Sequence, residues 1–355
     1  MSARCCTMDE KAARGRVRPA SGTGNRPEPS AVETRGQAHG KAILTGEHFV
    51  VWGGTALAIP LRATRLEVTL SAEPARRNSF RVEGEDPGGL LLRAARIGGR
   101  GFSTGRPHAT RVRTDADFPC MSGLGYSAAY SVAFCRALAE LRQVRDAEDR
   151  VAQVALDMER VFHERPSGID STTVAFDTPC FVKTGESFSV GEGRAADAQG
   201  PMAGFLDIAG GGVFLLADSG ERASTREVIG RVRALLDRPR GDLVLQRLTA
   251  VSESISLQTA TALRKGDFEF VGHMLDENHC LLAGLGVSTP RLDSLCRAAT
   301  RAGAYGAKLT GSGLGGFVLA VLTADRVPAV KKALKKQGVT RFILQNTDDF
   351  LNDSL

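Results

Sequence analysis

The sequence predicts an α+β protein, because short strand-like and helix-like segments are mixed along the chain without an internal repeat. Residues 66–70 alternate apolar and polar side chains with period two, as a half-buried strand does. Residues 127–143 are alanine-rich and apolar at helical spacing. At 355 residues the chain is long enough for two domains. We expect a disordered tail (1–35), an N-terminal domain (36–205) and a C-terminal domain (206–355).

The elements of the N-terminal half follow from local patterns. The tail is rich in Arg, Gly, Pro, Ser and Ala and lacks hydrophobic periodicity. Strand-like residues begin at Ala38, and the glycine-rich stretch 86–108 is predicted to be a loop. A second helix is expected over 147–162, since Pro166 prevents its continuation.

The C-terminal half starts with a strand over 212–218, after a run of three glycines. Thr289 and Pro290 predict the N-cap and first turn of a helix. The other elements are helical segments and two strands, expected over 224–238, 244–283 and 326–337 (helical) and over 316–322 and 341–345 (strands).

Composition excludes several classes of protein. The hydrophobic share of 42% is normal for a globular protein, and no apolar run approaches the ~20 residues that span a bilayer, so we expect no membrane insertion. Seven scattered cysteines without metal-ligand spacing indicate free thiols in a reducing compartment, the cytoplasm. The net charge of +6 is dispersed without a basic stripe interleaved with aromatics, which favours a small anionic ligand over nucleic acid.

The most informative segment is 40–54, GKAILTGEHFVVWGG. A strand that only filled a core would need no Gly-Glu-His break in its middle. Bent at Gly46, this strand can direct Lys41, Glu47 and His48 into a cleft. We therefore expect it to form one wall of a site.

A second segment, Pro119–Ala129, places Gly-Leu-Gly before a long apolar helix. Free N–H groups at a helix N-terminus and the helix dipole favour phosphate. The segment lacks the third glycine of the dinucleotide fingerprint and the Gly-Lys-Ser/Thr ending of a Walker A loop. A tight turn that caps the helix explains the pattern equally well.

Two further segments carry polar or glycine-rich patterns. Asp170 follows Pro-Ser-Gly and is predicted to lie in a rigid loop, eleven positions after Glu159. Both carboxylates could converge on a cleft, although alone Glu159 could be a solvated helix residue and Asp170 an N-cap.

Lys308–Gly316 contains four glycines in six positions and precedes a strand. This loop could close over an anion.

In this order, the segments resemble the motifs of the GHMP small-molecule kinases, named for galactokinase, homoserine kinase, mevalonate kinase and phosphomevalonate kinase. The resemblance extends from about Ala38 onward and includes all three family motifs. It implies a GHMP kinase fold, with a ribosomal S5 domain 2-like N-terminal domain and a ferredoxin-like C-terminal domain, and ATP bound between them.

Within the family, the opening motif and the segment from Glu159 to Asp170 are most similar to those of mevalonate kinases. The resemblance implies ATP-dependent phosphorylation of the primary hydroxyl of mevalonate, giving 5-phosphomevalonate for isoprenoid biosynthesis. The alternatives are a GHMP kinase for phosphomevalonate, the mevalonate 3-position or a sugar, and a catalytically silent nucleotide-binding sensor. The apolar Phe49–Val51 disfavours a sugar. A nucleic-acid binder acting through the tail is a third class.

The resemblance also implies roles for individual residues. Asp170 would be the general base, with Lys41 beside it, while Ser127 and Glu159 would hold Mg²⁺. The remaining roles are nucleotide binding by Ser122, Gly123, Leu124, Gly125, Tyr126 and Ser127, substrate binding by Glu47, His48 and Thr225, and a glycine-rich loop of Thr310, Gly311, Ser312 and Gly313.

Two departures from the family pattern bear on these roles. Tyr126 replaces the first serine of the usual Ser-Ser pair. Ser171 replaces a common asparagine, and the usual Gly-Gly is absent around 176–178. The sequence does not fix the oligomeric state, and a homodimer, common among mevalonate kinases, is compatible with it.

Overall fold

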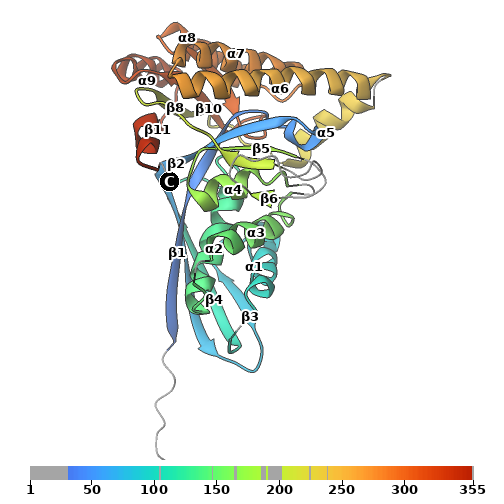
Figure 1. Cartoon of the computed structure of the whole chain (residues 1–355), viewed down its shortest axis with the longest axis vertical. Coiled ribbons are helices and arrows are strands. Elements are labelled where there is room, and N and C mark those ends of the chain that lie inside the picture. Colours follow the sequence, from blue (N-terminus) through green and yellow to red (C-terminus); the bar gives the residue numbers. More distant parts are fainter. Residues whose placement is uncertain are drawn as a thin grey trace, which may run out of the picture. The chain divides into compact units, whose positions relative to one another are not determined.

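The computed structural model describes residues 31–353, apart from positions 104, 146, 164–165, 185–188, 191–201, 224 and 238. Residues 31–355 form one compact unit that contains two β-sheets with helices packed on them (Figure 1). This arrangement confirms the expected α+β class. The predicted boundary at 205/206 falls between strands of the two sheets, and the division into two domains stays a prediction.

The larger sheet is built around a long antiparallel hairpin of β1 (Val32–Thr45) and β2 (Thr55–Pro74). Its other strands are β3 (Ser79–Glu83), β4 (His108–Ala116), β5 (Cys180–Lys183), β6 (Ser189–Val190) and β7 (Met202–Phe205), in the order β3-β4-β2-β5-β7-β6. Alternate residues at the start of β1 are buried, as expected for a half-buried strand. β1 begins at Val32, so its first four residues lie within the predicted tail (1–35), and residues 1–30 of that tail lie outside the described residues.

Four helices lie on one side of this hairpin (Figure 1). They are α1 (Leu90–Gly101), α2 (Tyr126–Leu141), α3 (Glu148–Glu159) and α4 (Ile169–Phe176). The small side chains of α2 let it pack closely against β1, β2 and α3, and most of its residues are buried. The helices predicted over 127–143 and 147–162 are confirmed as α2 and α3, the second ending three residues earlier.

The predicted loop over 86–108 is wrong, because α1 occupies most of it. Its glycines permit close packing instead of turns. A Cβ atom on Gly98 would lie 2.7 Å from Met158 Sδ, and one on Gly99 would lie 2.4 Å from a ring carbon of Phe80. These contacts join parts of the chain far apart in sequence, so the local pattern could not reveal them.

The smaller sheet is antiparallel, with β8 (Val213–Asp218), β9 (Gly306–Thr310), β10 (Phe317–Leu322) and β11 (Phe342–Asn346) in the order β11-β8-β10-β9. The predicted strands over 212–218, 316–322 and 341–345 are confirmed, whereas β9 was missed. Alternate residues of β8 enter two hydrophobic clusters. Leu215 packs in the cluster that includes residues of α8 (Pro290–Arg301) and α9 (Val327–Lys336), and Phe214 packs in the cluster shared with the larger sheet.

The helices of this half are α5 (Thr225–Leu236), α6 (Gly241–Lys265), α7 (Phe268–Gly284), α8 (Pro290–Arg301) and α9 (Val327–Lys336). The stretch predicted as helical over 244–283 consists of two helices, α6 and α7, separated at Gly266, whose φ is +72°. The N-cap prediction for α8 is confirmed, since Thr289 Oγ1 accepts a hydrogen bond from Leu292 N at 3.2 Å.

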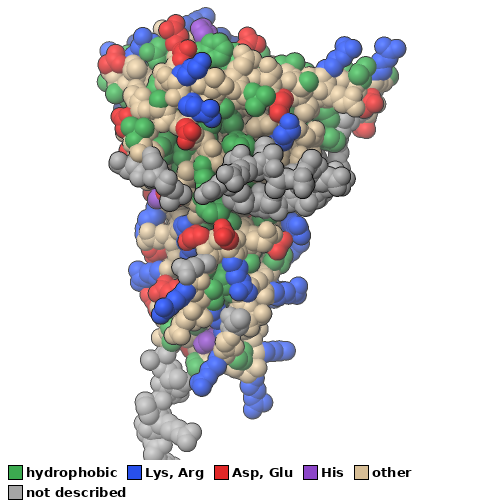
Figure 2. Space-filling view, in the orientation of Figure 1, with side chains coloured by type: hydrophobic (Ala, Val, Ile, Leu, Met, Phe, Trp, Pro, Cys, Tyr) green, Lys and Arg blue, Asp and Glu red, His purple; other side chains and the backbone are tan. Residues whose placement is uncertain are grey.

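Charged side chains are dispersed over the surface. On the face shown in Figure 2, Lys and Arg are interspersed with Asp and Glu. Many pair across strands, as Arg65 does with Asp115 at 3.0 Å. Among the described residues, no helix combines the length and apolar character needed to cross a membrane.

Candidate active site

The centre of the candidate site is an ion pair between β1 and α4. Lys41 Nζ lies 2.9 Å from Asp170 Oδ1, and the two side chains are 3% and 21% exposed. Asp170 is the second residue of α4, a helix that begins directly after its N-cap Gly168 (φ +84°), so the predicted place of Asp170 in a loop is wrong. The helix is only eight residues long, too short for a periodic pattern to reveal it. The structure thus brings together two residues that are 129 positions apart in the sequence.

Two buried carboxylate oxygens at this pair have incomplete hydrogen bonding. In the described part of the chain, Asp170 Oδ1 has the Lys41 ammonium beside it and accepts no other hydrogen bond, and Glu159 Oε1 accepts none. Buried acceptors without donors are costly. They indicate a place for a ligand hydroxyl or a cation.

Glu159, at the end of α3, is in an unfavourable environment for a charge. Burial and then the nearby Asp170 raise the pKa of this carboxyl well above its usual value, against the opposing effects of Lys41 and a hydrogen bond from Ser171. Two carboxylates therefore share one lysine. A bound cation would offset the excess negative charge of the two carboxylates.

The predicted phosphate loop lies directly against Lys41. Its residues lead into α2, whose N-cap is Gly125 with φ +75°. Lys41 N donates to Leu124 O at 2.9 Å, and a Cβ atom on Gly125 would lie 2.8 Å from Lys41 Cγ. Glycine is therefore needed here both for its backbone conformation and for the passage of the lysine side chain. Ser127 is in the first turn of α2 and half-buried.

The two glycine-rich loops touch each other. A Cβ atom on Gly311 would lie 2.7 Å from Gly123 Cα, and one on Gly316 would lie 2.7 Å from Ser122 O. A small pocket lies between the loops, lined by Met121, Ser122, Gly123, Ala223, Thr310, Ser312, Gly313, Gly315 and Gly316. Segments almost 190 residues apart thus form one glycine-rich surface, a composition that suits phosphate.

Tyr126, which departs from the family pattern, is half-buried and packs edge-on against Phe118 with ring centroids 5.9 Å apart. Burial raises the pKa of its phenol. The ring thus joins the aromatic packing beneath the loop.

Glu47, predicted to bind substrate, is occupied by internal partners. Its carboxylate forms an ion pair with Lys308 of β9 and accepts a hydrogen bond from Asn278 Nδ2 at 3.0 Å. Burial lowers the pKa of the Lys308 ammonium. The geometry favours a structural role for Glu47, and its predicted role in substrate binding stays a prediction. Lys308 is the first residue of the glycine-rich segment Lys308–Gly316, and the sequence pattern indicates no role for its side chain.

His48 and Thr225 are the other predicted substrate residues. His48 has φ +68°, and its Nε2 donates to Ser312 O at 2.9 Å, so it connects the opening segment to the glycine-rich loop. Burial lowers the pKa of His48, which favours the neutral ring. Thr225 is the first residue of α5, and its side chain lies outside the described part of the structure.

His163 is a neighbour of the ion pair to which the sequence assigned no role. Its pKa is lowered by burial and is affected by the charges of Asp170 and Lys41. The one sequence feature that indicates His163 as a site residue is its position shortly after the helix that carries Glu159.

Comparison with protein families matches both halves of the chain. Residues 90–177 match the GHMP kinases N terminal domain, and residues 259–340 match the GHMP kinases C terminal domain. The mevalonate kinase of Aeropyrum pernix is 28% identical over 311 residues, which cover 82% of this chain and 90% of that enzyme.

Solved structures show the same fold. The crystal structure of L. major mevalonate kinase in complex with R-mevalonate has a TM-score of 0.73 at 25% identity and covers 89% of this chain and 97% of its own. Streptococcus pneumoniae phosphomevalonate kinase, in complex with phosphomevalonate and AMPPNP, has a TM-score of 0.70 at 15% identity, with coverages of 88% and 99%. The second likeness supports the fold alone, so the comparisons leave the acceptor open.

Proposed function

Because the chain belongs to the GHMP kinase family of ATP-dependent phosphotransferases, we propose that it is a mevalonate kinase. It would transfer the γ-phosphoryl group of ATP to the primary hydroxyl of mevalonate. The observation that carries the proposal is the Lys41–Asp170 pair, whose carboxylate has the Lys41 ammonium beside Oδ1 and no further hydrogen bond to that oxygen in the described residues, and which lies next to a glycine-rich loop. The A. pernix relative supports the choice of acceptor.

In this proposal Asp170 is the general base. An alcohol is a weak nucleophile near neutral pH, so a positioned carboxylate must accept its proton as attack proceeds. A carboxylate has two oxygens and about four lone-pair sites, so Asp170 can accept this proton while its Oδ1 stays beside the Lys41 ammonium. Lys41, 2.9 Å away, stabilises the negative charge that develops on the hydroxyl oxygen and the transferring group.

The glycine-rich loops would bind the triphosphate. Gly123, Gly125 and Gly311 have positive φ values, a backbone conformation that glycine adopts readily and that loops around an anion often use. Substitution at any of these positions would require a strained backbone. His48, through its hydrogen bond to Ser312 O, keeps the second loop attached to the opening segment.

The residues also fit Mg²⁺. Glu159 Oε1 is a buried oxygen without a partner, and Ser127 lies on α2, which packs on α3. Oxygen donors suit this hard cation, which would neutralise charge on the β- and γ-phosphates when bound. The described residues contain no group of three or more His, Cys, Asp or Glu able to hold a metal. Phosphate oxygens would therefore have to complete the coordination.

The proposal is tested by ADP release with ATP and Mg²⁺ in the presence of mevalonate, phosphomevalonate, galactose or homoserine. We expect turnover on mevalonate alone, with phosphorus NMR showing a phosphate monoester on the primary carbon. Turnover only on another acceptor would contradict the assigned substrate while keeping the kinase. Absence of turnover on all four, with ATP still bound, would contradict the proposed activity and favour a sensor.

A further inference from the structure

The end of α4 opposite to Asp170 adopts an unusual backbone. Its C-cap is Asp177, with φ +50° and ψ +32°, in the left-handed region. A residue with a side chain costs about 1–2 kcal/mol there, and glycine is the usual choice. Asp177 stands in the region where the family pattern usually has Gly-Gly. Some other contact must therefore stabilise this end of the helix.

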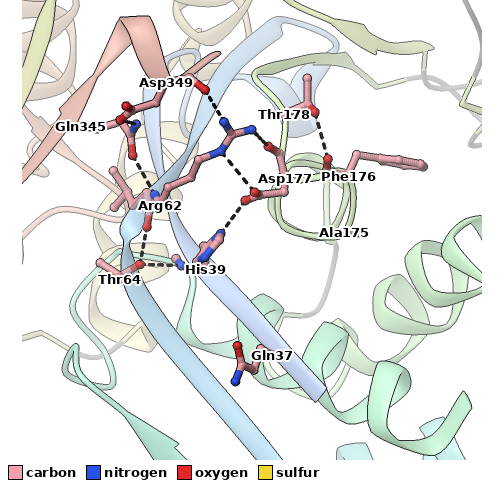
Figure 3. Close-up of polar contacts among 12 residues, drawn as sticks. Gln37, His39, Arg62, Thr64, Ala175, Phe176, Asp177, Thr178, Gln345 and Asp349 are labelled. Carbon is pink, nitrogen blue, oxygen red and sulfur yellow. Dashed lines mark hydrogen bonds and ion pairs between the residues drawn. The ribbon is translucent and has the colours of Figure 1, made fainter. Parts of the chain in front are cut away.

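The carbonyl groups of the last two residues of α4 and of its cap accept hydrogen bonds from side chains. Arg136 Nη2 donates to Ala175 O at 2.8 Å, and Thr178 Oγ1 donates to Phe176 O at 2.9 Å. Arg62 Nη2 donates to Asp177 O at 2.7 Å (Figure 3). Cations near a helix C-terminus also complement its dipole. The end of α4 is thus fixed to the surrounding elements.

The Asp177 side chain adds two further links. Its Oδ2 accepts from Arg62 Nε at 3.2 Å, and its Oδ1 lies 2.7 Å from His39 Nδ1 (Figure 3). These partners come from the long hairpin, His39 from β1 and Arg62 from β2. Asp177 therefore joins α4 to both strands of the hairpin, one of which carries Lys41.

Arg62 extends the same network to the C-terminal part of the chain. Its Nη1 donates to Asp349 O, and its backbone N donates to Gln345 Oε1 at 2.7 Å. Gln345 Nε2 in turn donates to Asp349 Oδ2 at 2.8 Å (Figure 3). The guanidinium also lies over the Phe350 ring, 5.3 Å from its centroid. The Arg62 side chain, which belongs to β2, thus contacts both the cap of α4 and the 3₁₀ segment Thr347–Asp353.

We propose that Arg62 is a positioning residue for phosphoryl transfer. Through Asp177 it fixes the C-terminal end of α4, and so sets the place of Asp170 relative to Lys41. Asp170 and Asp177 are seven residues apart, about 10 Å along the helix. A short helix moves as a rigid piece, and a displacement of about 1 Å at a reacting group can cost about 100-fold in rate. This inference rests on the proposed kinase function.

The test compares Arg62→Met with Arg65→Met, an arginine on the same strand whose ion pairs with Glu67 and Asp115 are on the surface. Steady-state kinetics would be measured below the melting temperature of each variant. We expect kcat of Arg62→Met to fall by about 10-fold or more, since Asp170 is displaced. The KM for ATP should change less than about 2-fold, since Asp177, Gln345 and Asp349, to which Arg62 bonds, lie outside the glycine-rich loops. Arg65→Met should keep the wild-type kcat.

Two further variants separate positioning from simple stabilisation. Arg62→Lys keeps the charge but cannot reach all the acceptors of a guanidinium, so it should restore kcat only in part. In Asp177→Gly the glycine adopts the left-handed backbone readily, and the side chain with its carboxylate is lost. We expect this variant to fold normally, with a kcat several-fold lower than that of the wild type. The effects of Arg62→Met and Asp177→Gly on kcat should be non-additive in the double variant.

The inference is overturned if wild-type enzyme is active and folded Arg62→Met retains kcat within about 2-fold, even with a lower melting temperature. Additive effects of Arg62→Met and Asp177→Gly would contradict the link between them. Inactive wild-type enzyme would instead contradict the proposed function, so the two failures are distinguishable.

Discussion

Two ion pairs involve the same opening segment, and they differ in how completely their carboxylates are satisfied. Lys41 pairs with Asp170, whose side chain is 21% exposed and whose Oδ1 accepts no hydrogen bond besides this contact in the described structure. Glu47 pairs with Lys308; these side chains are 3% and 0% exposed, and Asn278 donates to the second carboxylate oxygen. The same chemistry therefore serves two purposes. An unsaturated pair can take part in a reaction, whereas a saturated pair holds strands together.

The surroundings of the two pairs explain this difference. The first lies beside glycine loops, where a substrate can bring a hydroxyl to Asp170. The second joins β9 to the bend after β1, and Lys308 Nζ also donates to Ile43 O at 3.4 Å. Fully buried ions need such partners, because each loses its hydration on burial.

The largest expected effect is on stability, at the saturated pair. Lys308→Met leaves the Glu47 carboxylate buried without its cation, which should lower the free energy of unfolding by about 3–5 kcal/mol. Urea unfolding followed by circular dichroism measures this change. The double variant Glu47→Gln/Lys308→Met should recover part of the loss, since no unpaired charge remains. A single variant within about 1 kcal/mol of wild type would show that the pair is not structural.

The next largest effect is on rate, at the unsaturated pair. Lys41→Met should lower kcat by about 10²–10³-fold, because the cation that stabilises the developing charge is lost. The matched control is Lys183→Met, which removes a more exposed ion pair with Glu253 and should keep kcat. Steady-state assays with mevalonate measure both. A Lys41→Met enzyme as fast as wild type would mean that the pair does not take part in phosphoryl transfer.

Sequence reasoning predicted the local features of this comparison well. The bend at Gly46, the helix after the Gly-Leu-Gly loop and the cap at Thr289 each depend on a few consecutive residues. Their conformations follow from local sterics and hydrogen bonding. The convergence of Lys41 and Asp170 came from the family resemblance, since local patterns cannot reveal a pairing across 129 positions.

Features that depend on tertiary packing were missed or wrong. Gly98 and Gly99 indicated a loop, yet they let α1 approach Met158 and Phe80. The partner of Glu47 is 261 positions away, and no pattern around either residue indicates that pairing. The helix under Asp170 is too short to show a period. The glycine contacts and the Glu47–Lys308 pair join residues far apart in the sequence, and α4 is shorter than the stretch that a periodic pattern needs.

The smallest expected effect concerns Glu159, which shares Lys41 with Asp170. Because its pKa in the folded protein lies well above 4.5, the unfolded chain releases a proton that the folded protein retains as pH rises above 4.5. The free energy of unfolding therefore falls through this window, until the folded carboxyl also ionises. Glu159→Gln removes this dependence.

In EDTA at about pH 7, Glu159→Gln should raise the melting temperature by about 1–2 °C for each kcal/mol recovered. Thermal unfolding across about pH 4–8 measures the change, and the same variant should require more Mg²⁺ for turnover. A melting temperature below that of wild type at neutral pH would contradict the unfavourable charge at Glu159.

The most direct test of the account is the single-turnover rate of phosphoryl transfer in Asp170→Asn, measured by rapid quench with ATP, Mg²⁺ and mevalonate. Asparagine keeps the shape of the side chain but cannot accept the proton. The account predicts a rate about 10²–10⁴-fold below wild type, with affinity for ATP changed less than about 3-fold. A rate within about 10-fold of wild type would contradict Asp170 as the general base and the role given to the unsaturated pair.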